Sequence, residues 1–198
     1  MAQSSLVDDP EPVPATEYLD PRDDQQLIAA INCGDSAAFE VLYFRYRDWV
    51  VGLAHRITGD SDTALDVMQG TFLYFLRKFP GFRLTANLKT FLYPAVRNLS
   101  IAARKKTGRY QATENELEQL ERAPAPELRE SGAGELAVVL AGLSEDHREV
   151  VHLRFVDGLS LAEIAQAVEV PLGTVKSRLH NALELLRQDE RTKEFFGQ

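Results

Sequence analysis

The chain has 198 residues, a formal net charge of −8 at pH 7 and 44% hydrophobic residues. This length suits one large domain or two small ones, and the composition is ordinary for a globular protein. No apolar run approaches the roughly 18 residues needed to span a bilayer, and the acidic N-terminus lacks the basic and apolar parts of a signal peptide. We therefore expect a cytoplasmic protein without direct membrane insertion.

Residue types that carry catalysis or bind metals are sparse. Cys33 is the only cysteine, so an internal disulfide is excluded, and the expected role is a small buried residue. His147 and His152 are close in the chain, but a spacing of five does not place two ligands on one helical face. No phosphate loop, nucleophile elbow or paired-carboxylate motif stands out. The sequence predicts no enzyme, no cofactor, no metal and no small-molecule substrate.

Charge is distributed very unevenly along the chain. Residues 1–24 carry seven acids and one base, whereas residues 77–110 carry nine bases and no acid. A basic block inside an acidic protein is typical of a confined nucleic-acid site, because the acidic surroundings repel DNA elsewhere.

The N-terminal half predicts helices after an acidic tail. Residues 1–22 hold four prolines and little that can pack, so we expect a disordered tail. Apolar residues within 27–31 favour a short helix, and Asp35 can cap the next one. The aromatic stripe that follows, 39–53, has helical spacing and is expected to be core. A third helix should run from the turn at 59–63 to Lys78.

The basic block passes through a loop at 79–87 and enters a fourth helix that Asn87 can cap. Aromatic residues alternate with cations here, which is expected of a surface where single-stranded bases stack on rings and cations follow the backbone. The alternative is that the rings are core and the charges are a solvated face, and the residues alone do not decide. The members are Phe82, Phe91, Tyr93, Arg83, Lys89, Arg97, Arg104, Lys105, Lys106 and Arg109.

Residues 107–134 are acidic and contain APAP and SGAG, so they predict a flexible linker. A second domain, 135–198, follows. The expected fold is all-α, with two small helical domains joined by this linker and a helix-turn-helix in the C-terminal one.

Residues 158–187 have the pattern of two short helices around a tight turn. Ser160 and Glu163 form a capping box for the first helix, which should stop near Val168. Pro171 suits the entrance of a second helix from about Leu172.

In that second helix an apolar stripe leaves a polar face outward, with Glu184 one turn further on. The outward set suits reading base edges and holding phosphates, as the N-terminal half of a recognition helix does. A plain surface hairpin with solubilising charges is the alternative. The candidate DNA-reading residues are Thr174, Lys176, Ser177, Arg178, His180 and Asn181.

These motifs resemble the bacterial extracytoplasmic-function sigma factors, the two-domain promoter-recognition subunits of RNA polymerase. The segment LSEDHREVVHLRFVDGLSLAEIAQAVEVPLGTVKSRL is similar to the family's C-terminal domain, which reads the −35 element. DVMQGTF and FLYPAVRNLSIAARKK are similar to the N-terminal domain, which binds the polymerase and melts the −10 element. The resemblance covers about 23–106 and 135–188.

The resemblance implies partners and residue roles. Core RNA polymerase and promoter DNA are the implied partners, and members are commonly held by an anti-sigma factor. Asp66, Gln69 and Phe72 would face the polymerase, and Asn98 with nearby bases would hold the melted strand. The loop at 79–87 would receive flipped bases. The implied −10 residues are Phe82, Arg83, Asn87, Lys89, Phe91, Arg97, Asn98, Arg104 and Lys105.

Several positions depart from the family's pattern, namely Leu65, Gly70, Phe91, Pro94, Ala102, Asn181 and Leu183. They indicate a divergent sigma factor with its own promoter. The alternative is a degenerate DNA-binding adaptor that no longer supports initiation.

Overall fold

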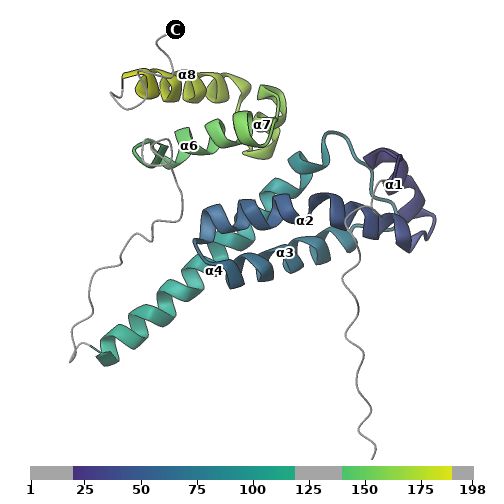
Figure 1. Ribbon diagram of the computed structural model, residues 1–198, viewed down its shortest axis with the longest axis horizontal. Helices are drawn as coiled ribbons and strands as arrows, with labels where there is room; N and C mark the ends of the chain where they lie inside the picture. Colours follow the sequence, from purple (N-terminus) through teal and green to yellow (C-terminus); the bar gives the residue numbers. More distant parts are fainter. Residues whose placement is uncertain (1–19, 119–139, 189–198) are drawn as a thin grey trace, which may run out of the picture.

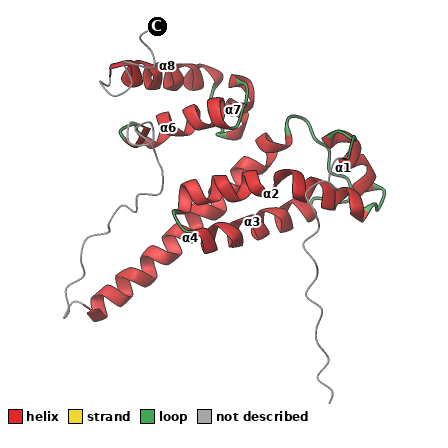
Figure 2. Ribbon diagram, in the orientation of Figure 1, coloured by secondary structure: helices red, strands yellow, loops and turns green. Residues whose placement is uncertain are grey.

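The structure, a computed structural model, describes residues 20–118 and 140–188. Most of the expected acidic tail, residues 119–139 of the chain between the domains and residues 189–198 lie outside the described residues. Within the described ranges every regular element is helical and no strand occurs, so the expected all-α fold is confirmed (Figure 2).

The N-terminal domain consists of four helices that pack around one core (Figure 1). They are α1 (Asp24–Asn32), α2 (Ser36–Thr58), α3 (Ser61–Leu76) and α4 (Leu88–Glu118). Aspartates begin the first three, because a short carboxylate at the N-cap accepts from an otherwise unpaired backbone N–H. Asp35 accepts from the N–H of Ala38 at 3.2 Å, as expected, and Asp60 accepts from that of Thr63 at 2.7 Å.

The core of this domain is the expected apolar stripe of α2 packed on α3 and α4. Leu42 and Val50 of α2 are fully buried, as are Phe75 of α3 and Leu92 of α4. The exposed fraction of Tyr46 is 8%, and its hydroxyl donates to Asp24. The prediction that the 39–53 stripe is core therefore holds for most of its members.

The C-terminal domain contains α6 (Glu145–Val151), one π-helical turn η2 (His152–Val156), α7 (Leu161–Ala167) and α8 (Leu172–Gln188). Both hydrogen bonds of the capping box at the start of α7 are present. Glu163 N–H donates to Ser160 Oγ at 3.3 Å, and Ser160 N–H donates to Glu163 Oε2 at 2.8 Å. Ile164 and Val175 are fully buried in one apolar cluster, so α7 and α8 share a core. The helix-turn-helix has the predicted boundaries.

The two domains lie against each other in the structure. α7 packs on α4, and one continuous apolar cluster joins Leu88, Leu92 and Val96 of α4 to Leu159 and Ile164 (Figure 1). α6 and α7 lie between α8 and the N-terminal domain. The sequence did not predict this contact, because the acidic segment between the two domains indicated a flexible linker.

Two expectations about local structure are wrong. The linker was expected to begin at Thr107, but α4 continues to Glu118, because the residues that follow are good helix formers and extending a helix is easier than starting one. Cys33 was expected to be buried but is exposed. It forms the C-cap of α1, where Gly34 turns the chain with a φ of 93°.

Candidate nucleic-acid interfaces

The outward face of α8 is largely the one that the sequence predicts. Lys176, Ser177, His180 and Asn181 are exposed, while Thr174 is half-buried. The face is polar and carries one lysine, and it stands on the buried stripe of Val175, Ala182 and Leu186. Its side chains have the donors and acceptors needed to contact base edges.

Arg178 differs from the other members of this set. Its guanidinium forms an ion pair with Asp146 of α6, and its side chain is only 22% exposed. Asp146 engages Nη2 of this guanidinium, so a bidentate contact with guanine that uses Nη2 requires Arg178 to leave Asp146.

The basic face of α4, which we define as Lys89, Arg97, Arg104 and Lys105, contains two kinds of cation. Arg104 and Lys105 are exposed, as are Arg83 in the loop and Asn98 on α4. Lys89 and Arg97 are half-buried and are both engaged by the C-terminal domain. In this conformation the cations that are fully accessible to a ligand are therefore the exposed ones, Arg83, Arg104 and Lys105.

The loop at 79–87 is held by contacts that the sequence did not reveal. Asn32 Nδ2 donates to the Phe82 carbonyl at 2.8 Å, and the N–H of Gly81 donates to Asn32 Oδ1 at 2.6 Å. At the far end, Asn87 Oδ1 accepts from the N–H of Lys89 at 2.9 Å, so Asn87 caps α4 as expected. Asn32 is the last residue of the short helix α1, and the sequence gives no signal of its contact with the loop.

The aromatic residues of this region pack mainly on one another. The Phe82 and Phe91 rings are 4.6 Å apart between centroids, and they lie 5.4 and 5.8 Å from the buried ring of Phe75. Both remain half-buried, so each keeps an exposed edge. The sequence left open whether Tyr93 is a surface ring or core, and its exposed fraction is 2%. The core interpretation therefore holds for Tyr93 and for much of Phe82 and Phe91.

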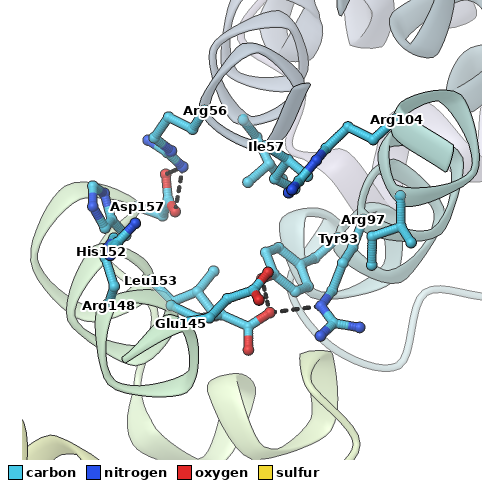
Figure 3. Close-up of a pocket in the computed structure, with 13 residues that line it drawn as sticks. Arg56, Ile57, Tyr93, Arg97, Arg104, Glu145, Arg148, His152, Leu153 and Asp157 are labelled. Carbon is cyan, nitrogen blue, oxygen red and sulfur yellow. Dashed lines mark hydrogen bonds and ion pairs between the residues drawn. The ribbon is translucent and has the colours of Figure 1, made fainter. Parts of the chain in front are cut away.

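Asp157 is the centre of a polar contact between the domains (Figure 3). Its side chain is 1% exposed and accepts from Trp49 Nε1 at 2.8 Å and from Arg56 Nη2 at 3.0 Å. Lys89 Nζ donates to the Asp157 carbonyl oxygen at 3.0 Å. A buried carboxylate needs such partners, because an unpaired charge in the interior is very costly.

Glu149 makes a second contact of this kind. Its Oε1 accepts from the Tyr93 hydroxyl at 2.5 Å and from Arg97 Nε at 2.7 Å. Burial, and next the negative charge of Glu149, raise the pKa of the Tyr93 hydroxyl. Burial lowers the pKa of Arg97, but the charge and hydrogen bond of Glu149, together with Tyr93 and Glu145, raise that pKa overall. Tyr93 is thus a neutral donor and Arg97 a cation.

A cavity of about 510 Å³ lies between the domains beside these contacts (Figure 3). Most of its charged groups already have partners in the protein, and Arg148 donates to the carbonyls of Leu140, Ala141 and Leu143. The lining residues are Leu53, Arg56, Ile57, Tyr93, Arg97, Ile101, Arg104, Glu145, Arg148, Glu149, His152, Leu153 and Asp157.

The residues predicted to face the polymerase lie on α3, and they do not all point outward. Asp66 and Gln69 are exposed, but Phe72 is 5% exposed and packs on the rings of Phe39 and Tyr43. Phe72 falls on the apolar stripe of α3, and its contact with the polymerase, which the resemblance implies, stays a prediction.

Several large apolar side chains on α3 and the adjoining part of α4 are exposed, which the sequence did not predict. This apolar surface consists of side chains with exposed fractions between 36 and 55%, namely Leu65, Leu73, Tyr74, Leu76 and Leu99. Gly70 adjoins it, and a Cβ built there would lie 3.2 Å from Leu99 Cδ1. The glycine therefore allows α3 and α4 to approach closely at this point.

The described residues include no group of three or more His, Cys, Asp or Glu side chains that could hold a metal ion. In the same part of the chain, no helix is both long and apolar enough to cross a membrane.

Comparison with known families matches both helical regions. Residues 42–110 match Sigma-70 region 2, and residues 139–188 match Sigma-70, region 4. The RNA polymerase sigma-H factor of Pseudomonas aeruginosa is 30% identical over 176 residues, which cover 82% of this chain and 91% of that protein. The ECF RNA polymerase sigma-E factor of Haemophilus influenzae is 30% identical over 177 residues, covering 82% of this chain and 93% of that protein.

Among solved structures, the sigma factor RpoE of Bartonella quintana in complex with the anti-sigma factor NepR is similar. The TM-score is 0.56 at 25% identity, with 76% of this chain and 94% of that chain covered. Two such regions in one all-α chain define a non-enzymatic factor of transcription initiation. The chain belongs to the extracytoplasmic-function sigma factors, which direct RNA polymerase to promoters. None of these findings favours a degenerate adaptor.

Replacing Phe72 with Ala tests its assignment to the core. We expect the free energy of unfolding in urea to fall by about 3–5 kcal/mol, the usual cost of truncating a buried phenylalanine. Gln69→Ala, on the exposed side of the same helix, is the matched control and should change it by less than about 0.5 kcal/mol. Equal effects of the two substitutions would contradict the core assignment.

Proposed function

We propose that this sigma factor contacts promoters through two surfaces, one on each domain. The outward face of α8 reads the −35 element, and the loop at 79–87 with the basic face of α4 captures the melted −10 strand. The observation that carries this is the polar face of α8, with Lys176, Ser177, His180 and Asn181 exposed over a buried stripe. We assign residues 23–106 to the −10 domain and 135–198 to the −35 domain.

At the −35 element, the N-terminal half of α8 would lie in the major groove. Thr174, Ser177 and Asn181 supply hydrogen-bonding groups for base edges, and Lys176 supplies charge for phosphate. Glu184 lies further along α8 and forms an ion pair with Arg187 at 2.7 Å. A carboxylate there would be repelled by phosphate, so the groove contact ends before it.

At the −10 element, flipping a base out of the stack costs a few kcal/mol, which a pocket and stacking must offset. The half-buried Phe82 and Phe91 offer ring edges or faces at the loop, and Asn32 keeps the loop in place. Arg83 in the loop is exposed, as are Asn98, Arg104 and Lys105 further along α4, and these side chains can hold the strand's phosphates.

The polymerase would bind α3. Asp66 and Gln69 are exposed next to the apolar surface formed by Leu65, Leu73 and Leu76, a combination typical of a protein-binding face. Polymerase binding places the protein in the cytoplasm. The complex of RpoE with NepR supports extending the proposal to an anti-sigma partner for this chain.

In vitro transcription with core RNA polymerase and fragmented genomic DNA tests the proposal as a whole. We expect discrete start sites that depend on this protein and share two elements upstream. A folded protein that binds the core enzyme but gives no discrete start site would refute it.

Replacing Arg178 with Ala tests the −35 assignment. If Arg178 leaves Asp146 to make a bidentate base contact, affinity for a −35 duplex should fall by about 1–3 kcal/mol in a fluorescence anisotropy titration. Asp146→Ala is the matched control, because it also breaks the ion pair but leaves the guanidinium in place. Its affinity should not fall. A loss of affinity equal in both variants would assign Arg178 a structural role.

Replacing Lys105 and Lys106 with Ala tests the −10 assignment. Each phosphate contact that is lost should reduce the slope of log affinity against log salt by about 0.7–0.9, because fewer counterions are released. The measurement is anisotropy of single-stranded promoter DNA over a salt series. Arg47→Ala on α2 removes an exposed cation outside the proposed surface and should leave the slope unchanged. An unchanged slope in the lysine variant would show that these lysines are solvated surface charges that do not contact phosphate.

A further inference from the structure

Asn32, the last residue of α1, holds the backbone of the loop at 79–87 at two consecutive residues (Figure 1). Its Nδ2 donates to the Phe82 carbonyl at 2.8 Å, and its Oδ1 accepts from the Gly81 N–H at 2.6 Å. Within the part of the chain that the structure describes, these are the two hydrogen bonds that residues 81–86 make. Hydrogen bonding therefore ties this stretch of backbone to the fold through the amide of Asn32.

The side chains of the loop alternate in exposure. Arg83, Thr85 and Asn87 are exposed, whereas Phe82 and Leu84 between them are half-buried and pack against the apolar core. Such alternation is typical of an extended segment that lies on a surface, and a shift of one residue would exchange the inward and outward sets. The register of the loop therefore decides which side chains face a ligand.

Apolar packing alone does not fix this register tightly. Contacts of Phe82 and Leu84 with the core are non-directional, and both side chains are only partly buried. Hydrogen bonds, by contrast, constrain both a distance and an angle. Gly81 has a φ of 97°, a conformation that favours glycine, so the chain turns where Asn32 holds it. The amide of Asn32 thus fixes the position and the direction in which the loop leaves this turn.

We propose that Asn32 is a positioning residue for base recognition, because it sets the register in which the loop presents Arg83 and Thr85 to the melted −10 strand. α1 thereby takes part in promoter selection, although it lies outside the basic block of residues 77–110. This inference rests on the proposed function of the loop. It adds the residue that orients the loop, and it adds Thr85 to the side chains that face the strand.

The proposal separates two properties of DNA binding. Contacts to phosphate carry no sequence information, and they depend on charge more than on the exact placement of a donor. Contacts to a base edge require donors and acceptors in a defined geometry. A loop that has lost both bonds to Asn32 can adopt more than one register. It should therefore lose its preference for particular bases and keep most of its contribution to phosphate binding.

The test uses the holoenzyme formed by core RNA polymerase and the full chain. One promoter from the transcription experiment is randomised in its −10 element, and each template carries a transcribed barcode that identifies its sequence. Sequencing of the transcribed barcodes gives the base preference at every position. A second library, randomised in the −35 element, is transcribed in parallel. Arg83→Ala and Thr85→Ala mark the −10 positions that the loop reads.

Two substitutions of Asn32 are compared with a matched control. Asn32→Ala removes both hydrogen bonds, whereas Asn32→Asp keeps an acceptor for the Gly81 N–H but cannot donate to the Phe82 carbonyl. Gln25→Ala removes an exposed amide from the same helix. The negative charge of Asn32→Asp should weaken binding equally for all templates, so it does not affect the comparison of bases. Circular dichroism checks the fold of each variant.

We expect Asn32→Ala to reduce the base preference by about five- to 150-fold, the discrimination that one good base contact supplies, at the same −10 positions as Arg83→Ala or Thr85→Ala. Asn32→Asp should reduce it at those positions by a smaller factor. The −35 preference of both variants, and both preferences of Gln25→Ala, should equal those of the unsubstituted chain. The melting temperature of Asn32→Ala should fall by no more than about 10 °C, because two neutral hydrogen bonds contribute little net stability.

A −10 preference that Asn32→Ala retains, with or without an equal loss of transcription from all templates, would overturn the positioning role and leave the function of the loop intact. If Asn32→Ala does not fold, the same criterion applies to Asn32→Asp. If Arg83→Ala and Thr85→Ala both leave the −10 preference unchanged, the loop does not read the strand. In that case its proposed function and the role of Asn32 are refuted together.

Discussion

The burial of one carboxylate, that of Asp157, constrains how the two domains sit together. An isolated carboxylate in the interior is very costly, so its position is favourable only while Trp49 and Arg56 of α2 hold it. Both partners come from the other domain. Asp157 is therefore buried only while the two domains pack together, and separating them must expose its carboxylate to water.

The distribution of charge explains how an acidic protein can carry a basic site. A net charge of −8 disfavours nonspecific association with DNA, and the bases concentrated between residues 77 and 110 provide a local exception. Where the domains pack together, Arg97 donates to the Glu149 carboxylate and Lys89 to the Asp157 carbonyl oxygen. Part of the positive charge of this block is therefore already paired within the protein.

Local features of the fold were predictable because they depend on neighbouring residues. The capping box of Ser160 and Glu163 and the start of α8 after Pro171 follow from hydrogen-bonding and dihedral preferences within a few positions. The outward α8 residues follow from helical periodicity alone. The resemblance to a known family supplied the polymerase and promoter roles, which no periodicity could give.

The features that sequence missed depend on contacts across the fold. The resemblance implied that Phe72 faces the polymerase, but the ring packs on Phe39 and Tyr43 of α2. Asn32 and Asp157 look like ordinary polar residues in the sequence, because their partners are 50 and 108 positions away. Arg178 was identified as a reader from its face, but its ion pair with Asp146 needs the position of α6.

The placement of α3 separates its apolar surface from the contact between the domains. α7 packs on α4, and α3 lies on the side of the N-terminal domain away from the C-terminal one (Figure 1). Leu65, Leu73 and Leu76 are exposed although the two domains are packed together. A protein partner that binds α3 therefore need not compete with the C-terminal domain for the same residues.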